Sequence, residues 1–380
     1  MVHIAFITNI CPHYRVKTFE KLTEYFPNLN FYFFSAGNEW YWQQQHGVKK
    51  GNFSFQYLYG FSLGKTRIVP SLAWKLLKGD YDVYIKCING RFALPITYLV
   101  ARIRKKPFIL WTGIWMRLNT PAHRVFFPIT RYIYKHADAI VTYGEHVKRY
   151  LISEGVQPNK IFATTHAVDN EFYSQSVSVQ DKKNLKIKLN IAEDKKIILY
   201  LGRIEKIKGL PYLLESFISL NRDDTILVIA GTGSELSVLK KIVSDNGIQD
   251  KVRFAGYVSS VDTLPYYAIS DMFVLPSITT NRGKETWGLV VNEAFNQGLP
   301  VIATDAVGAA AGGLIENGVN GFIVPEQNSK ALANAIQYIL NDQTLQKQMS
   351  QNALRKIAKW DNELMVKGFE EAVEYVIRAK

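Results

Sequence analysis

The chain has 380 residues, of which 47% are hydrophobic and 21% are charged, and its formal net charge is +13. This length excludes a single small module and predicts two or three domains, while the composition excludes a disordered chain. No apolar stretch approaches the roughly 20 residues of a membrane-spanning helix, and no leader-like segment precedes the strand-like residues from Val2 onward, so we expect a cytoplasmic protein. Cys11 and Cys87 stand outside any zinc-binding spacing, and we expect no metal.

Short apolar runs alternate with helical patterns along the first half of the chain. The predicted strands are residues 2–8, 29–34, 82–86, 107–111 and 139–143, and a helix is predicted near residues 15–25. A polar, lysine-rich stretch at residues 174–196 follows, which we interpret as a linker or an exposed excursion. The strand pattern then restarts, with each strand followed by a helical segment, at residues 197–202, 225–231, 251–256, 272–277 and 299–304.

Repeated alternation of strand and helix is typical of parallel sheets that carry helices on both faces. The restart therefore predicts an α/β fold of two doubly wound, Rossmann-like domains that face a central cleft. We expect these domains at residues 1–178 and 179–358, and a helix at residues 359–380 that returns to the first domain. In such sheets, ligands bind beyond the carboxyl ends of the strands.

The positive charge is concentrated in the first half of the chain. Residues 1–180 carry 22 Lys and Arg against 10 Asp and Glu, a net charge of +12, whereas residues 181–380 carry 24 against 23, a net charge of +1. Nucleic acid, an anionic membrane surface and an anionic substrate each account for such an excess, and charge alone does not choose among them. The cluster Trp40-Tyr41-Trp42 is a candidate interfacial anchor. The basic run Arg102 to Lys106 is a second candidate, although cations at a helix end also complement the helix dipole.

The predicted strand at residues 197–202 runs into a basic loop that is suited to an anion. Gly202-Arg203 opens this loop, and Lys208-Gly209 closes it before a helix. Glycine lets a ligand approach the backbone, an arginine fork grips two phosphate oxygens, and a lysine neutralises developing charge. The loop therefore suggests a diphosphate site, with a basic surface loop as the plainer alternative for this motif alone.

Further along, Glu285 and Glu293 stand eight residues apart, at and inside the predicted start of a helix. At about 1.5 Å per residue they would lie roughly 12 Å apart along the helix axis, farther than the paired carboxylates of glycosidases. Two acceptors at that distance fit the hydroxyls of two sugars joined by a diphosphate, with the amides of Leu289 and Val290 at the phosphates between them. A nucleotide-sugar has this shape.

Three other motifs carry weaker signals. Gly60 to Thr66 has the wrong spacing for a phosphate-binding loop, and Gly231-Thr-Gly233 lacks the third glycine of a dinucleotide fingerprint. Asp80-Tyr-Asp82 is similar to a metal-binding motif, but it precedes a predicted strand, where carboxylates more often end a helix or open a turn.

These motifs, in this order, resemble those of the family-4 retaining glycosyltransferases of GT-B fold. The resemblance covers most of the second domain and is looser in the first, where it rests on the opening strand and on Thr165 to Asp169. The segments that carry it in the second domain are Gly202-Arg203, Lys208-Gly209, Gly231 to Gly233, Phe254 to Gly256, Pro276-Ser277, Glu285 to Glu293, and Asn317 to Pro325.

The resemblance implies roles for individual residues in the second domain. Arg203, Lys208 and Glu285 would be the catalytic residues, with the two cations on the donor diphosphate and Glu285 on the transferred sugar. Glu293 would hold the ribose. The rest of the implied donor site consists of Gly202, Gly233, Tyr257, Val258, Gly288, Leu289 and Val290, with the backbone near Tyr257 and Val258 at the base.

One position in the first domain departs from the family pattern. Many relatives carry a histidine after the strand that matches residues 107–111, whereas this chain has Thr112 and Gly113 there. The resemblance also places the loop His13-Tyr14-Arg15 on the side of the acceptor or the donor phosphates, where a helix start favours an anion.

The implied reaction is a retaining, metal-independent transfer of a hexose from a nucleoside diphosphate sugar, without a cofactor, to a lipid-linked or growing glycan acceptor. The first domain would serve the acceptor and contact the inner face of an anionic cytoplasmic membrane, and the second would bind the donor. We expect no nucleic acid partner. Two alternatives remain: a nucleotide-sugar epimerase on the same fold, and a basic nucleic-acid-binding protein, which leaves Glu285 and Glu293 unexplained.

Overall fold

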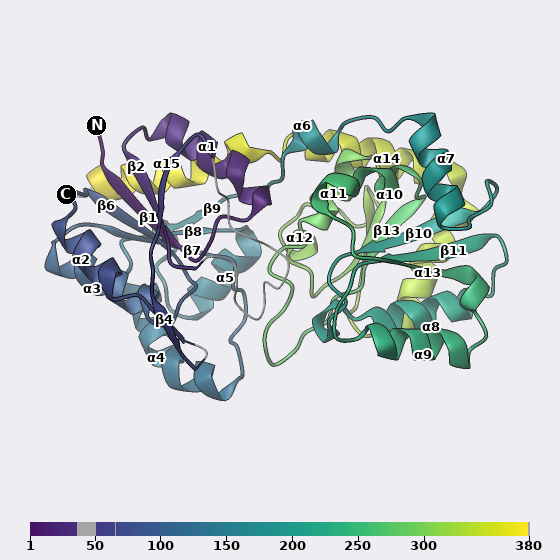
Figure 1. Ribbon diagram of the computed structural model, residues 1–380, viewed down its shortest axis with the longest axis horizontal. Coiled ribbons are helices and arrows are strands. Elements are labelled where there is room, and N and C mark those ends of the chain that lie inside the picture. The colour runs from purple at the N-terminus through teal and green to yellow at the C-terminus, as the bar shows by residue number, and fades with distance from the viewer. Residues whose placement is uncertain (36–50, 65, 379–380) are drawn as a thin grey trace. The chain divides into compact units, whose positions relative to one another are not determined.

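The computed structural model describes residues 1–35, 51–64 and 66–378, and the chain divides into two compact units (Figure 1). Unit 1 comprises Met1–Val168 and Asp361–Lys380, and unit 2 comprises Asp169–Trp360. The chain thus leaves unit 1 ahead of the boundary expected at residue 178 and returns to it close to residue 359. Trp40, Tyr41 and Trp42 lie outside the described residues.

Unit 1 contains a seven-stranded sheet whose paired strands are all parallel. The strand order is β3-β2-β1-β6-β7-β8-β9, and β4 and β5 form a separate antiparallel pair. The strands are β1 (Ile4–Thr8), β2 (Leu29–Phe33), β3 (Ser54–Tyr57), β4 (Phe61–Leu63), β5 (Thr66–Ile68), β6 (Val83–Cys87), β7 (Phe108–Thr112), β8 (Ala139–Thr142) and β9 (Ile161–Ala163).

Helices cover both faces of this sheet (Figure 1). They are η1 (His13–Arg15), α1 (Val16–Tyr25), α2 (Pro70–Lys78), α3 (Ala93–Ile103), α4 (Pro121–His136), α5 (Glu145–Ser153), η2 (Pro158–Lys160) and α15 (Asn362–Arg378). Helices α1 and α15 bury their apolar faces in one core, where Phe19 and Phe369 pack on Phe6 of β1 with ring centroids 5.4 and 5.8 Å away. Helices α2, α3 and α5 close the opposite core. The C-terminal helix therefore completes unit 1.

Unit 2 contains a six-stranded parallel sheet of order β12-β11-β10-β13-β14-β15, the doubly wound order of a Rossmann domain. Its strands are β10 (Lys196–Leu201), β11 (Thr225–Ala230), β12 (Val252–Gly256), β13 (Met272–Leu275), β14 (Val301–Thr304) and β15 (Gly321–Val324). The two α/β domains predicted from the sequence are confirmed.

The helices of unit 2 lie in two layers about the sheet (Figure 1). Helices α8, α9 and α13 pack together on one side, and α7 and α10, like α11 and α14, pack on the other. The helices are α6 (Asn170–Tyr173), α7 (Val179–Lys188), η3 (Lys206–Lys208), α8 (Leu210–Leu220), α9 (Leu236–Asp245), η4 (Gln249–Lys251), η5 (Ser260–Asp262), α10 (Leu264–Ala268), α11 (Val290–Asn296), α12 (Gly308–Ala311), α13 (Ser329–Asn341) and α14 (Gln343–Ile357).

The lysine-rich stretch at residues 174–196 is largely exposed, as expected, but the linker interpretation is wrong for its centre. Ser178 caps helix α7 by accepting a hydrogen bond from the Asp181 N–H at 3.0 Å, and Leu185 anchors the helix by its buried side chain. A helix with one buried residue among lysines lacks the apolar stripe, repeating every three to four residues, by which a helix is recognised in a sequence. The sequence pattern therefore did not indicate α7.

The strand order reverses once in each sheet, between β1 and β6 in unit 1 and between β10 and β13 in unit 2. At such a switch point the connections leave the two central strands toward opposite faces, which opens a crevice at their carboxyl ends. The loops that follow these four strands are therefore the places to look for a site.

Candidate active site

In unit 2 the two loops at the switch point carry the predicted donor residues. The loop after β10 contains Lys208, and the loop after β13 leads to Glu285. The Lys208 amine donates to the Glu285 carboxylate in an ion pair. The two side chains are only 12% and 16% exposed, so water screens this pair far less than a surface pair. The structure thus brings together two residues that lie far apart in the sequence.

A glycine allows these loops to touch. Gly209 follows η3 with a φ of 63°, and a β-carbon built there would lie 2.0 Å from the Pro276 carbonyl oxygen. The Ile278 N–H donates to the Ile207 carbonyl at 2.8 Å directly beside it. Any other residue at 209 would push the lysine loop away from the strand that leads to Glu285.

The backbone of Glu285 is fixed from the other side by the start of α12. Its carbonyl accepts a hydrogen bond from the Gly308 N–H at 3.1 Å, and a β-carbon at Gly308 would lie 2.1 Å from the Thr286 carbonyl oxygen. The carboxylate is therefore carried by a segment that is held on both sides, which favours a preorganised group.

The expectation that Glu285 and Glu293 share the start of one helix is wrong. Helix α11 begins at Val290 with Leu289 as its N-cap, and the chain turns before it at Gly288, which has a φ of 88°. Glu285 therefore precedes the helix by a turn of loop. The axial rise of 1.5 Å per residue does not apply between the two carboxylates.

Glu293 lies in the first turn of α11 and accepts a hydrogen bond from the Tyr267 hydroxyl at 2.7 Å. Burial raises the pKa of Glu293 to about 7, and hydrogen bonds from Tyr267 and Tyr173 oppose this shift. Both tyrosines come from elements that the sequence analysis did not associate with the site. In the sequence these tyrosines stand out only as members of the aromatic pairs Tyr266-Tyr267 and Phe172-Tyr173. Such pairs are equally typical of residues that pack in a hydrophobic core.

Backbone hydrogen bonds tie together the loops after β10, β11 and β12. The Ile204 N–H donates to the Thr232 carbonyl at 2.8 Å, and the Gly231 N–H donates to the Gly256 carbonyl at 2.7 Å. A β-carbon at Gly233 would lie 2.1 Å from the Ile204 carbonyl oxygen. Close backbone contact therefore explains the glycines at 231 and 233. The loops that contain them form an exposed edge at the carboxyl ends of these strands.

Four residues of the predicted donor site lie along this edge. Gly202 follows β10, and the buried Tyr200 hydroxyl donates to the Arg203 carbonyl at 2.6 Å, which holds the turn. The Arg203 side chain is 60% exposed and pairs with Glu205 at 2.8 Å. Tyr257, just after β12, is 57% exposed, and its neighbour Val258 is half-buried.

In unit 1, Thr112 and Gly113 stand at the carboxyl end of β7. The Thr112 hydroxyl is buried and accepts a hydrogen bond from the Ile114 N–H at 3.2 Å. A β-carbon at Gly113 would lie 2.4 Å from the Tyr143 ring. The ring of Tyr143 therefore occupies the space that a side chain at 113 needs, which gives a steric reason for the missing histidine.

Of the loop predicted on the acceptor side, only its first residue is exposed. His13 faces solvent and Tyr14 is half-buried, whereas Arg15 is 5% exposed. The Arg15 guanidinium lies 4.5 Å from the Trp111 ring centroid and 2.8 Å from His166 Nε2. Burial and Arg15 lower the pKa of His166 well below its usual range, so this histidine is neutral.

Polar residues that the sequence analysis missed meet at the switch point of unit 1. Asn89, after β6, donates to the Asn9 side chain, after β1, at 2.8 Å. The buried Lys86 amine donates to the Asn89 and Cys87 carbonyls at 2.7 and 2.6 Å, and burial lowers its pKa to about 7. Only the pairing of β1 with β6 brings these residues together.

Of the two acidic residues considered for a metal, Asp82 is engaged elsewhere and Asp80 is exposed. Asp82 pairs with Lys106 at 3.0 Å and accepts a hydrogen bond from the His3 N–H at 3.1 Å. Across residues 1–35, 51–64 and 66–378, no three His, Cys, Asp or Glu side chains gather in a way that suits a metal ion. Over the same residues, no helix has the length and apolar character to cross a bilayer.

Known proteins are similar to this chain in sequence and in fold. The family model described as glycosyl transferases group 1 matches residues 181–356. Alpha-D-kanosaminyltransferase from Streptomyces kanamyceticus is 27% identical over 287 residues, or 71% of each chain. The capsular polysaccharide biosynthesis glycosyltransferase CapM from Staphylococcus aureus is 26% identical over 273 residues, or 68% of each chain. Two further relatives are matched over only 57% and 60% of their own length.

Among solved structures, Anabaena HepE in complex with UDP has a TM-score of 0.80 at 19% identity, and the match covers 98% of this chain and 100% of that one. At this identity the likeness concerns the fold. The family model thus identifies a glycosyl transferases group 1 domain at residues 181–356, within unit 2, and the two Rossmann-like units have the GT-B fold that the resemblance implied.

Proposed function

We propose that the protein moves a hexose from a nucleoside diphosphate sugar to a lipid-linked or growing glycan acceptor, with retention at the anomeric carbon. The observation that carries this proposal is the shielded pair of Lys208 and Glu285 at the switch point of unit 2. The UDP in the complex with HepE supports the choice of donor class, and the polysaccharide named for CapM supports the choice of acceptor class.

The donor diphosphate becomes more negative as the bond from the sugar to its oxygen breaks. Lys208, already desolvated and aimed by Glu285, is placed to neutralise this charge. The exposed Arg203 would leave its ion pair with Glu205 and bind phosphate oxygens instead. The backbone amides of Leu289 and Val290 would direct their dipoles at the same phosphates. Groups that are fixed before the reaction stabilise the transition state more than the ground state, so a metal is not required in this proposal.

Retention follows from attack on the same face of the sugar. The acceptor hydroxyl forms the new bond to the anomeric carbon, the bond to the diphosphate breaks, and the hydroxyl proton passes to the departing phosphate. Glu285 then binds hydroxyls of the transferred sugar in competition with Lys208. Glu293, with a pKa near 7, is suited to a ribose hydroxyl because it accepts when ionised and donates when protonated.

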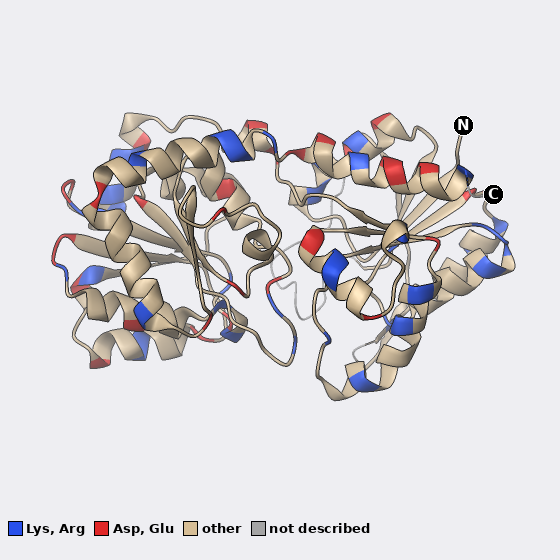
Figure 2. Cartoon of the chain, turned by 180° about the vertical axis from the view of Figure 1, so that it is seen from behind, with Lys and Arg blue, Asp and Glu red and all other residues tan. Residues whose placement is uncertain are grey.

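The alternatives weighed from the sequence differ in what they explain. An epimerase on the same fold would use the donor site without an acceptor, but the two relatives named above are both transferases. A nucleic-acid-binding protein would use the cations of unit 1, which Figure 2 shows spread over several helices and loops. We therefore assign these cations to an anionic membrane at the inner leaflet, where a lipid-linked acceptor resides.

A screen of nucleotide-sugars by thermal unfolding tests the donor proposal. A ligand that binds only the folded state raises stability by about 2.7 kcal/mol at one hundred times its Kd. We expect stabilisation by a nucleoside diphosphate and its sugar conjugate, and release of the nucleotide when acceptor is added. Stabilisation without transfer to any glycan or lipid acceptor, accompanied by isomerised sugar, would favour the epimerase instead.

A further inference from the structure

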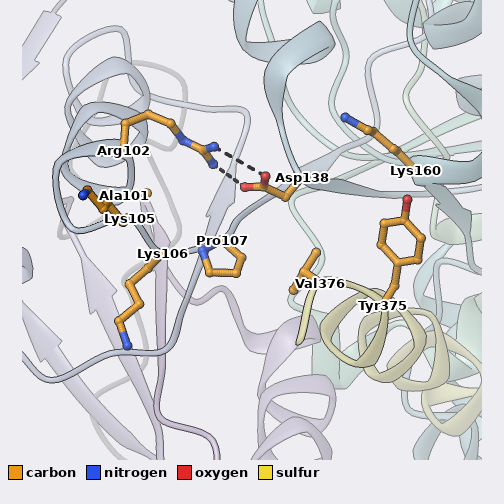
Figure 3. Close-up of a pocket in the computed structure, with 9 residues that line it drawn as sticks. All are labelled: Ala101, Arg102, Lys105, Lys106, Pro107, Asp138, Lys160, Tyr375 and Val376. Atoms are coloured by element: carbon orange, nitrogen blue, oxygen red, sulfur yellow. Dashed lines mark hydrogen bonds and ion pairs between the residues drawn. The ribbon is translucent and has the colours of Figure 1, made fainter. Parts of the chain in front are cut away.

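The cations at the two ends of the sheet of unit 1 are held in different ways. At the amino ends of the strands, Arg102 pairs with the carboxylate of Asp138 beside the pocket drawn in Figure 3. At the carboxyl ends, Lys86 of β6 is completely buried, and its hydrogen-bond partners among the described residues are neutral oxygens. Burying a charge is costly unless its donors are satisfied. The tolerance of this position therefore depends on what the Lys86 amine bonds to.

Three oxygens surround the Lys86 amine, one for each of its donors. The amine donates to the Cys87 carbonyl at 2.6 Å, to the Asn89 carbonyl at 2.7 Å and to the Asn89 side-chain oxygen at 3.1 Å. The ring of Phe34 lies 4.9 Å from the same amine. An ammonium group has three donors and no acceptor, so it accommodates an amide oxygen and rejects an amide nitrogen in that place. Lys86 thus fixes the oxygen of the Asn89 carboxamide toward itself.

The Asn89 carboxamide passes this orientation on to the loop after β1. Because its oxygen faces Lys86, its nitrogen faces the other way, where it donates to the Asn9 side-chain oxygen at 2.8 Å and to the Thr8 hydroxyl oxygen at 3.3 Å. The Thr8 hydroxyl in turn donates to the same Asn9 oxygen at 3.2 Å. Two donors therefore occupy the oxygen of the Asn9 carboxamide, and its nitrogen is turned away from them.

The side-chain nitrogen of Asn9 makes no hydrogen bond to another residue in the described parts of the chain. Asn9 is half-buried and follows β1 directly, at the point where the strand order reverses. Its backbone carbonyl accepts a hydrogen bond from the Ser35 N–H at 2.8 Å, so the backbone is fixed as well. Two N–H donors are thus held at the crevice where ligands of such sheets bind, and a ligand that contacts them must offer an acceptor oxygen.

We propose that Lys86 is a positioning residue for the acceptor substrate, because through Asn89 it holds the Asn9 N–H groups toward an oxygen of the acceptor glycan. This inference rests on the proposed function, in which unit 1 serves the acceptor. Lys86 itself is buried and touches no substrate. A phosphate oxygen of the donor would also accept from these N–H groups, so the test separates the two substrates.

The variant Asn89→Asp reverses the orientation at almost constant volume. The new carboxylate keeps an oxygen at Lys86 and gives this buried amine a counter-ion, but it offers Asn9 an acceptor in place of a donor. The Asn9 carboxamide then turns over, so that its nitrogen faces the carboxylate and its oxygen faces the substrate. Urea unfolding should show equal or higher stability. The KM for the acceptor should rise roughly ten- to a hundredfold, because two acceptor oxygens then face each other.

Transfer is measured from the donor found in the thermal screen to octyl glucoside, octyl galactoside and octyl N-acetylglucosaminide, which are short lipid-linked sugars. The assay is run at pH 6, below the pKa of Lys86, which burial lowers to about 7. The matched control is Asn30→Asp on β2, a half-buried asparagine of the same sheet whose side-chain oxygen accepts from the Ser54 hydroxyl at 3.1 Å. It introduces the same charge without touching Lys86 or Asn9, and its acceptor KM should equal that of the parent protein.

Three results would overturn this inference alone. One is an acceptor KM in folded Asn89→Asp that matches the parent protein or the control. Another is a raised donor KM with an unchanged acceptor KM, which would assign the Asn9 N–H groups to a donor phosphate. The third is a loss of stability that accompanies the loss of transfer, which would make Lys86 and Asn89 a purely structural pair. Absence of transfer from the parent protein to all three glycosides, with or without stabilisation by UDP, would instead overturn the proposed function and this inference with it.

Discussion

The pair of Lys208 and Glu285 should be coupled in stability as well as essential for transfer. Lys208→Ala leaves a shielded carboxylate without its cation, and Glu285→Ala leaves the lysine without its anion. Removing one partner of a fully buried pair costs about 3–5 kcal/mol, and an exposed pair contributes about 0.2–1 kcal/mol. At 12% and 16% exposure we expect about 2 kcal/mol for each single variant.

The double variant should cost little more than either single one, because no isolated charge remains. The coupling from the double-mutant cycle is then about 1–2 kcal/mol, well above the 0.3–0.5 kcal/mol error of additivity. Urea denaturation of the four proteins measures it. Lys241 and Asp245 of α9 form a matched control pair, 2.8 Å apart but 76% and 56% exposed, for which the coupling should be near zero.

Transfer should fall in each single variant by a factor on the order of a hundred to a thousand, since each removes a preorganised group. Nucleotide release from the best donor of the thermal screen is the assay, at urea-free conditions where all variants are folded. Additive stability losses together with parental turnover would refute the reasoning that this pair is shielded, coupled and part of the donor site.

Three further outcomes are expected. Because the folded-state pKa of Glu293 lies near 7, above its ordinary value of 4.5, the contribution of Glu293 to stability is full below about pH 4.5 and is lost as pH rises through 7. In urea titrations, Glu293→Gln should flatten this dependence of stability on pH. Tyr267→Phe should move the loss of stability to higher pH, because it removes a hydrogen bond that favours the ionised carboxylate. Gly113→Ala should cost about 1–3 kcal/mol through collision with the Tyr143 ring, and unchanged urea unfolding would contradict that packing. Transfer should persist in EDTA, whereas loss restored by Mg²⁺ would direct attention back to Asp80 and Asp82.

The sequence by itself determined the features that repeat locally. Apolar runs and turn residues recur every few residues, so they marked five strands of each sheet and the two-domain α/β fold, and they left out β3, β9 and β15. The loop from Gly202 to Gly209 and the pair of glutamates were also found, because each motif lies within one short segment. A helix with a single buried residue, such as α7, has no such local signal and was missed.

Only the tertiary structure decided which residues meet. The contact of Lys208 with Glu285 spans 77 positions and depends on the pairing of β10 with β13. Asn9 reaches Asn89 because β1 pairs with β6, and Tyr267 reaches Glu293 because α10 and α11 lie on one face of the sheet. Pairing of distant strands sets these distances, and a chain read in order carries no information on strand order. Burial was decided in the same way. Arg15 and Gly113 were predicted as ligand positions, but Trp111 of β7 lies against Arg15, and Tyr143, just after β8, lies against Gly113. The pairing of β7 with β8 brings these two rings there.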